Sequence, residues 1–344
     1  MNTSHCAACL RALKKSETGF CRPCRTELFD GAPVSARLSL AVPSQATVPE
    51  AEHFRQLMRQ ISISGVQEKF SLALSASEPS RLEFVVRAGA YLLKPVPPVR
   101  FAAVQSVPAN EHFTMQLARQ VFRLPTAACA LLHLADGSPA YLTRRFDVLP
   151  TGERLAQEDF AQLSQRTEPA HGPNYKYDFS HEEIGALIKR YLPSYYLPEA
   201  TLFFRLTLFH YLVSNGDAHL KNFSLHRRPE TGEYRLTPTY DLLNTSLHVN
   251  DGNGLALDLL AGDDETPSFA ANAYLAYDDF AELGRRLGLP GSRVRRLLRD
   301  VVGHEAATEQ LLARSFLPLA QQQQYAESLA GRRQRLRYSL AGIA

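Results

Sequence analysis

An acidic and an amide side chain stand five residues apart in a polar loop of the chain. Asp217 and Asn222 lie in the stretch NGDAHLKN, which follows a long apolar run. A carboxylate in such a loop can take the proton of an attacking hydroxyl group, and an amide oxygen can hold a metal ion. Asp241, at the end of the segment RLTPTYD, offers a second metal ligand. The spacing predicts phosphoryl transfer, which depends mainly on positioned acids and metal ligands.

The residues around this loop fit the same chemistry, although each also has an ordinary structural interpretation. His219 and Lys221 can donate hydrogen bonds or charge to phosphate oxygens, while a loop histidine can equally be satisfied by its neighbours. Asp217 follows Asn215 and Gly216 and could be a turn residue, and Asp241 could cap a helix. The order of these groups along the chain favours the catalytic interpretation.

Nucleotide phosphates need a flexible cover and a cation, and both have candidates upstream. The candidate cover is Ser64, Gly65, Val66, Gln67, Glu68 and Lys69, where an ordinary turn is the alternative. Lys94 ends the apolar strand pattern YLLK and is the candidate cation, or else a surface lysine with a buried stem. Glu111, in the first turn of an expected helix, could pair with Lys94 or simply favour the helix N-terminus.

Two CxxC pairs near the N-terminus predict a metal site. Cys6, Cys9, Cys21 and Cys24 could close a tetrahedral thiolate site on one zinc ion. A site with all four positions taken by cysteine is structural or partner-binding rather than catalytic. A reduced loop without metal and a redox pair are the alternatives. The fifth cysteine, Cys129, lies in an apolar run and is expected to be a buried small side chain.

Composition excludes several classes of protein. The chain has 344 residues with 45% hydrophobic side chains, enough for one large two-lobed domain or two ordinary ones. The formal net charge of +3 is too small to indicate a polyanion partner. No apolar run approaches the roughly 18 residues of a membrane span, and the first residues lack the apolar core of a secretory signal. A cytoplasmic location is therefore expected.

Periodicity predicts an α+β fold whose strands precede its helices. Alternating or apolar runs predict strands in FSLAL, EFVVRA, YLLK, CALLHLA and AYLTRRF, the last two joined by an Asp-Gly turn. Helical patterns follow in PANEHFTMQLARQVF, EDFAQLSQ, HEEIGALIKRYL and the apolar run up to Val213. The expected organisation is a Cys segment (1–30), a connection (31–59), a small antiparallel-sheet lobe (60–150) and a mainly helical lobe (151–344).

These segments resemble the HipA family of bacterial serine/threonine kinase toxins. The matching stretches span residues 60 to 250: SISISGVQEKFSL, the Lys94 strand, ANEHFTMQLA, RRFD, QED, NGDAHLKNFSL and RLTPTYDLL. The resemblance implies a two-lobed protein-kinase-like fold, use of ATP with Mg²⁺, and phosphorylation of a protein serine. The family's known targets are aminoacyl-tRNA synthetases, whose inactivation halts translation.

The resemblance also implies roles for particular residues. Asp217 matches the catalytic base, Asn222 and Asp241 the magnesium ligands, and Lys94 the nucleotide lysine. The remaining ATP-binding positions are Ser64 to Lys69, Arg144, Arg145, Phe146, His219, Lys221 and Tyr240. Autophosphorylation in the family falls in the loop before the glycine, which here indicates Ser62 and Ser64.

One departure from the long family members concerns the N-terminus. About sixty residues with the Cys cluster stand where those members carry a longer N-terminal subdomain. This is similar to the short, HipT-like type, in which a HipS-like subunit and a DNA-binding, HipB-like antitoxin are separate proteins. DNA contact would then occur only through the complex. A non-catalytic kinase-like module in a repressor complex and a small-molecule kinase are the alternative functions.

Overall fold

The structure is a computed structural model of the chain. It describes residues 5–41, 68–86, 89–98, 102–149, 151–228, 230–249, 254–262, 264–340 and 342. The candidate residues outside these ranges are Ser62, Ser64, Gly65, Val66 and Gln67. The chain divides into two compact units. The first comprises residues 1–116, 127–154 and 310–321, and the second residues 117–126, 155–309 and 322–344.

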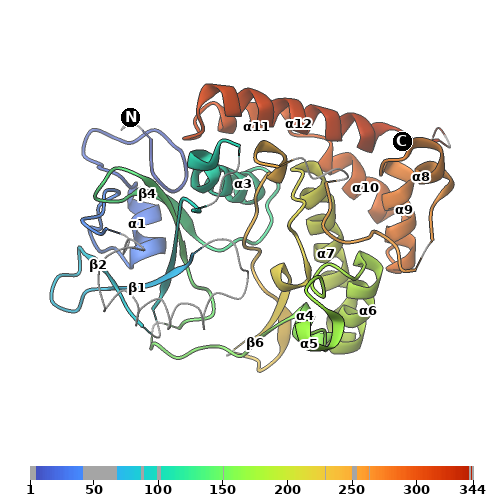
Figure 1. Ribbon diagram of the computed structural model, residues 1–344, viewed down its shortest axis with the longest axis horizontal. Coiled ribbons are helices and arrows are strands. Elements are labelled where there is room, and N and C mark those ends of the chain that lie inside the picture. The colour runs from blue at the N-terminus through green and yellow to red at the C-terminus, as the bar shows by residue number, and fades with distance from the viewer. Residues whose placement is uncertain are drawn as a thin grey trace. The chain divides into compact units, whose positions relative to one another are not determined.

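A five-stranded antiparallel sheet forms the centre of the first unit (Figure 1). Its strands are β1 (Phe70–Leu74), β2 (Leu82–Phe84), β3 (Tyr91–Pro95), β4 (Cys129–His133) and β5 (Pro139–Arg144), in the order β2-β1-β3-β5-β4. The turn between β4 and β5 contains Gly137 with a φ of 85°, a value that glycine adopts without strain. Because β3 is the middle strand, Lys94 lies at the centre of the sheet.

The N-terminal Cys segment shares one hydrophobic core with this sheet. Its helix α1 (Arg22–Phe29) has a proline in its first turn and ends at Asp30, which is left-handed with a φ of 52°. Phe20, Leu28 and Phe29 pack in the same core as strand residues such as Leu72 and Leu93. The segment is therefore an integral part of the unit's fold.

The described part of the expected connection also belongs to this core. Val34, Leu38 and Leu40 are buried in it. The Leu38 N–H group donates to the His133 carbonyl at 2.8 Å, and the Ala135 N–H group donates to the Leu40 carbonyl at 2.9 Å. Residues 36–40 consequently run beside β4 rather than leaving the unit.

Three helices contribute residues to both units along the chain. They are α3 (Val107–Gln120), α11 (Glu305–Leu312) and α12 (Leu319–Arg337). A single 3-10 turn, Val104–Ser106, leads into α3. The α3 residues in the first unit include Glu111 and His112, both buried.

The second unit is mainly helical, as expected from periodicity. Its helices are α4 (Phe160–Leu163), α5 (Glu168–His171), α6 (His181–Tyr191), α7 (Tyr196–Leu212), α8 (Pro267–Asn272), α9 (Tyr277–Arg286) and α10 (Gly291–Val301). A small sheet joins β6 (Gln157–Asp159), β7 (Ser224–Arg227) and β8 (Tyr234–Leu236) in that order. The helix expected from Glu158 begins only at Phe160, because Gln157–Asp159 pairs with β7. Helix α7 is apolar on most sides and is correspondingly buried.

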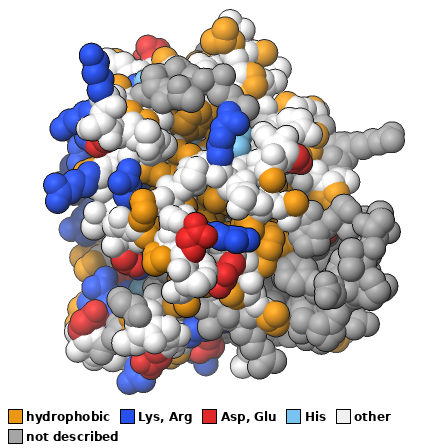
Figure 2. Space-filling view, turned by 90° about the vertical axis from the view of Figure 1, so that its left-hand side faces the viewer, with side chains coloured by type: hydrophobic (Ala, Val, Ile, Leu, Met, Phe, Trp, Pro, Cys, Tyr) orange, Lys and Arg blue, Asp and Glu red, His pale blue; other side chains and the backbone are white. Residues whose placement is uncertain are grey.

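The surface carries both signs of charge. On the face shown in Figure 2, Lys and Arg side chains gather along the left edge, and Asp and Glu side chains lie among other groups. Among the residues that the structure describes, none of the helices combines the length and the hydropathy that a membrane span requires.

Candidate functional site

Lys94 and Glu111 form a buried ion pair in the first unit. The Lys94 ammonium lies 2.6 Å from a Glu111 carboxylate oxygen, and each side chain is 4% exposed. Lys94 also lies over the Tyr141 ring, 5.4 Å from its centroid. Strand β3 and helix α3 supply the two partners, so the charge is fixed by regular structure. Removing either partner leaves a buried charge without the opposite charge beside it, so the loss of one partner is expected to destabilise the fold.

Other candidate nucleotide residues of the first unit have partners inside it. Arg144 makes two hydrogen bonds to the Asp30 carboxylate at 2.8 and 2.9 Å, and it donates to the Glu27 carbonyl at 2.8 Å. Arg145 pairs in the same two-point manner with Asp147. Arg144 thus holds α1 onto the end of β5. Glu68, Lys69 and Phe146 are described, but their role in binding a nucleotide remains a prediction.

Asp217 lies on the loop that follows α7 in the second unit. Its side chain is 60% exposed. The Tyr177 hydroxyl donates to Asp217 Oδ1 at 2.7 Å. Burial and the charge of Asp217 raise the pKa of Tyr177, so this hydroxyl stays protonated and remains a donor. The carboxylate is therefore accessible and has one oriented oxygen.

His219 and Asn222 stand beside Asp217 in the short turn that leads to β7. His219 Nε2 lies 4.0 Å from Asp217 Oδ1. Burial lowers the pKa of His219 to about 4, although the Asp217 charge acts in the opposite direction. The imidazole is consequently neutral near pH 7. The Asn222 Oδ1 atom accepts a hydrogen bond from the His219 backbone at 3.1 Å, which orients the amide.

Asp241 follows β8 and lies against the same loop. It has a φ of 55°, an uncommon value for a residue other than glycine. The Asn215 amide donates to the Asp241 carbonyl at 3.4 Å. The Tyr240 hydroxyl donates to the Lys221 carbonyl at 3.0 Å. The structure thus brings Asp241 and Tyr240 together with the stretch that holds Asp217, Lys221 and Asn222. Carboxylate and amide oxygens are ligands that suit Mg²⁺.

Three residues that no sequence motif indicated form hydrogen bonds to the loop that carries Asp217. The Thr245 hydroxyl bonds the Ser214 carbonyl and the Gly216 N–H group, both at 2.8 Å. Arg332 is 8% exposed and donates to the Ser214 hydroxyl at 2.9 Å. Tyr177, described above, lies 40 positions before Asp217. Long separation along the chain explains why no motif indicated these contacts.

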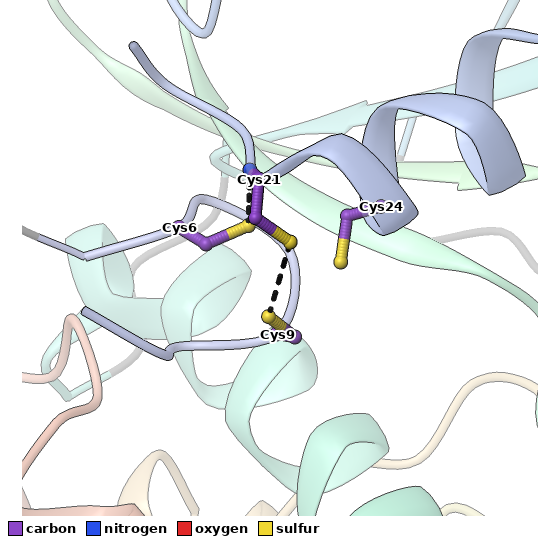
Figure 3. Close-up of side chains that lie close together, drawn as sticks. All are labelled: Cys6, Cys9, Cys21 and Cys24. Atoms are coloured by element: carbon purple, nitrogen blue, oxygen red, sulfur yellow. Dashed lines mark hydrogen bonds between the residues drawn. The ribbon is translucent and has the colours of Figure 1, made fainter. Parts of the chain in front are cut away.

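The two CxxC pairs bring four sulfur atoms together (Figure 3). All four lie within 4.8 Å of one another. Cys9 Sγ is 3.7 Å from Cys21 Sγ, and the Cys21 N–H group donates to Cys6 Sγ at 3.3 Å. Tetrahedral zinc with Zn–S bonds near 2.3 Å separates its sulfurs by about 3.8 Å. The group is thus compatible with one metal ion.

The electrostatics of the cluster favour a thiolate. Hydrogen bonds from Cys24 and Cys9 lower the pKa of Cys6, whereas hydrogen bonding with Cys6 raises the pKa of Cys24. A metal ion binds the deprotonated form of cysteine. Cys129 lies apart from this group, is buried, and accepts a hydrogen bond from the Gln116 amide at 3.3 Å.

Known proteins resemble this chain over most of its length. A family model described as the HipA-like C-terminal domain matches residues 61–309. The "Putative kinase" of Haemophilus influenzae is 26% identical over 328 residues, 91% of this chain and 92% of that protein. "Putative kinase Y4dM" of Sinorhizobium fredii is 29% identical over 256 residues, 71% of this chain and 58% of that protein.

A solved structure has a similar fold. A chain from the Shewanella oneidensis complex of the toxin–antitoxin proteins HipA and HipB with operator DNA superposes with a TM-score of 0.57. The two chains are 23% identical, and the match covers 86% of this chain and 74% of the other. The likeness confirms the predicted kinase-like fold class.

Proposed function

This chain belongs to the HipA-like C-terminal domain family, and we propose that it is an ATP- and Mg²⁺-dependent kinase that phosphorylates protein serine or threonine. The observation that carries the proposal is the exposed Asp217 carboxylate on a loop with buried supports. The relatives named as kinases support the reaction class.

The residues of the second unit have distinct roles in this proposal. Asp217 receives the proton of the substrate hydroxyl, and the Tyr177 hydroxyl, which donates to Asp217 Oδ1, orients the carboxylate. Neutral His219 can donate a hydrogen bond without adding charge. Asn222 and Asp241 would hold Mg²⁺, which neutralises phosphate charge when bound. Their oxygen ligands fit that hard ion.

In the first unit, Lys94 would contact the nucleotide phosphates. The Glu111 carboxylate lies 2.6 Å from the ammonium group and fixes its direction in a buried position. The segment Ser64 to Lys69 would cover the phosphates, and Arg145 and Phe146 would lie near the adenine. Arg144 shares that assignment, although its guanidinium group is paired with Asp30 here.

The biological role that we propose is the toxin of a toxin–antitoxin system. The similar Shewanella oneidensis structure contains HipA, HipB and operator DNA. By analogy, a DNA-binding antitoxin would bind this chain, with a separate HipS-like subunit as a further partner. The proposed target is an aminoacyl-tRNA synthetase.

Intact-mass measurement tests the kinase activity. Purified protein incubated with ATP and Mg²⁺ should gain phosphate on Ser62 or Ser64, and protein incubated with ATP and a chelator should not. Unmodified protein in both samples would contradict the proposal. Phosphoproteomics after induction, with the Asp217→Asn variant as control, would identify the substrate as the protein whose phosphorylation depends on Asp217.

We further propose that the four N-terminal cysteines hold one structural zinc ion. Metal analysis of protein purified without chelator should find about one zinc per chain. Cys24→Ser should remove it, whereas Cys129→Ser, which changes a buried cysteine outside the cluster, should not. Wild-type protein free of zinc would rule this site out.

A further inference from the structure

The turn of the first CxxC pair, residues 6–9, is joined to the sheet and to helix α3. The Ala7 carbonyl accepts a hydrogen bond from the Leu131 N–H group of β4 at 2.9 Å. The Ala8 carbonyl accepts a hydrogen bond from His112 Nε2 on α3 at 2.7 Å. Both alanines are buried. Movement of this turn would therefore disturb a contact to β4 and a contact to α3.

His112 is the neighbour of Glu111 in α3. The exposed fraction is 0% for His112 and 3% for Glu111. Because consecutive residues of an α-helix point about 100° apart, one side chain contacts the Cys segment while the other contacts Lys94. The His112 ring centroid also lies 5.8 Å from that of Phe316, so the ring contacts a further segment of the same unit. A shift of His112 would thus move the Glu111 carboxylate, which lies 2.6 Å from the Lys94 ammonium group.

The second CxxC pair is joined to the same sheet through helix α1. This helix begins directly after Cys21, and Cys24 lies in its first turn. Near the other end of α1, the Leu28 carbonyl accepts a hydrogen bond from the Tyr91 hydroxyl at 2.9 Å. Tyr91 and Lys94 belong to the same strand, β3. Each CxxC pair is therefore connected to an element that carries Lys94 or its partner.

A bound metal ion would tie these two connections to one another. Tetrahedral Zn²⁺ holds its four sulfur ligands at fixed separations, and the folding of short cysteine-rich segments commonly depends on that ion. The sulfur atoms here come from the turn 6–9 and from the start of α1. Without the ion these separations are no longer fixed by coordination. We therefore expect the turn to hold His112 less firmly when the metal is removed.

We propose that metal binding at the four cysteines fixes the position of Glu111 through His112, and so raises the affinity of the Lys94 region for nucleotide. A cation whose direction is already set binds phosphate at a lower entropic cost. The cysteine cluster is then a regulatory site, and His112 is the positioning residue that connects it to the ion pair. The proposal rests on the zinc site and the ATP-dependent kinase function proposed above.

Amide hydrogen exchange tests the structural step without nucleotide. Full-length protein is compared with zinc bound, after a chelator has removed the zinc, and after zinc is restored, with metal analysis of each sample. Without zinc, the amides of residues 111–116 in α3 should exchange at least about tenfold faster, whereas those of α6 in the second unit should be unchanged. Equal exchange of α3 in all samples overturns the proposal. An equal loss of protection in α3 and α6 also overturns it, because the metal would then support the whole fold.

Nucleotide titration tests the link through His112. The fluorescent ATP analogue mant-AMPPNP is titrated with Mg²⁺ into zinc-bound and zinc-free protein. Zinc should tighten binding to the wild type by about fivefold or more, and the analogue should tighten zinc binding by the same factor. In His112→Phe, which keeps a ring but lacks the donor to Ala8, zinc should remain bound and the ratio should fall to about one.

His181→Phe is the matched control for this titration. His181 is also 0% exposed and also bonds to a backbone carbonyl, that of Asp258, but it lies in the second unit. This variant should keep the wild-type ratio. Equal nucleotide affinity of the wild type with and without zinc overturns the proposal, and so does a folded His112→Phe variant that retains the full ratio.

The remaining outcomes separate this proposal from those on which it rests. Wild-type protein that holds no zinc contradicts the zinc site and this proposal with it. Zinc-bound protein that does not bind the analogue contradicts the kinase function, and hydrogen exchange then decides whether the metal fixes α3. If His112→Phe does not fold, the zinc dependence of exchange and of nucleotide binding in the wild type decides.

Discussion

The two groups of candidate catalytic residues differ in how far they are buried and in how their charges are paired. Lys94 and Glu111 are charged, paired and 4% exposed, and they lie on regular elements. Asp217 is 60% exposed on a loop, and the supports of that loop include the Thr245 hydroxyl and the Arg332 guanidinium. Charge that is buried and paired contributes to folding as well as to chemistry, whereas an exposed carboxylate can be lost without a folding penalty. The comparison therefore predicts that the fold depends on the ion pair and that Asp217, the proposed catalytic base, can be replaced with little change in stability.

The ion pair should give the largest change in stability. Lys94→Met removes the cation that faces the buried Glu111 carboxylate, which should cost about 3–5 kcal/mol of unfolding free energy. Urea unfolding would measure it, with Lys15→Met, at an exposed lysine, as the matched control.

A double variant tests whether the stability lost in Lys94→Met comes from the buried Glu111 charge. Lys94→Met combined with Glu111→Leu removes both charges and should recover much of the lost stability. If Lys94→Met alone were as stable as the Lys15→Met control, the ion pair would not have the structural role assigned to it.

Acid should destabilise the second unit through two buried histidines, of which His210 contacts the start of the Asp217 loop. Burial lowers the pKa of His181 to about 4 and the pKa of His210 to about 3. Neutral His210 accepts a hydrogen bond from the Asn215 amide at 3.0 Å. Below about pH 6.5 the unfolded chain binds protons that the folded chain does not, so stability falls as the pH drops toward those lowered values.

The expected slope is up to about 1.4 kcal/mol per pH unit for each of the two histidines. Urea midpoints measured between about pH 7.5 and pH 5 would show it, and His210→Gln should reduce the slope. A pH-independent midpoint over this range would contradict the neutral, buried state of these histidines.

The sequence predicted the local features of the five-stranded sheet and of the cysteine cluster. Alternating apolar residues and the Asp136–Gly137 turn predicted the five strands, and the CxxC spacing predicted the sulfur cluster. Side-chain periodicity and turn chemistry act over a few residues, so they can be read directly. The roles of Lys94, Asp217, Asn222 and Asp241 in catalysis remain predictions.

Long-range packing was not predictable in the same way. Arg332 reaches Ser214 across 118 positions, and Tyr177 reaches Asp217 across 40. The packing of the N-terminal segment in the core of the sheet likewise depends on contacts between distant residues, such as the Tyr91 hydroxyl donating to the Leu28 carbonyl. Such contacts depend on tertiary packing, and they produce no local pattern by which a single sequence could reveal them.

The central claim is that Asp217 serves the reaction and not the fold. The most direct test compares ADP formation from ATP and Mg²⁺ with urea unfolding in the wild type and Asp217→Asn. The rate should fall by about 10²–10⁴-fold, as expected for loss of a general base, while the unfolding free energy changes by less than about 0.5 kcal/mol. An Asp217→Asn variant that is folded and retains the wild-type rate would contradict the account.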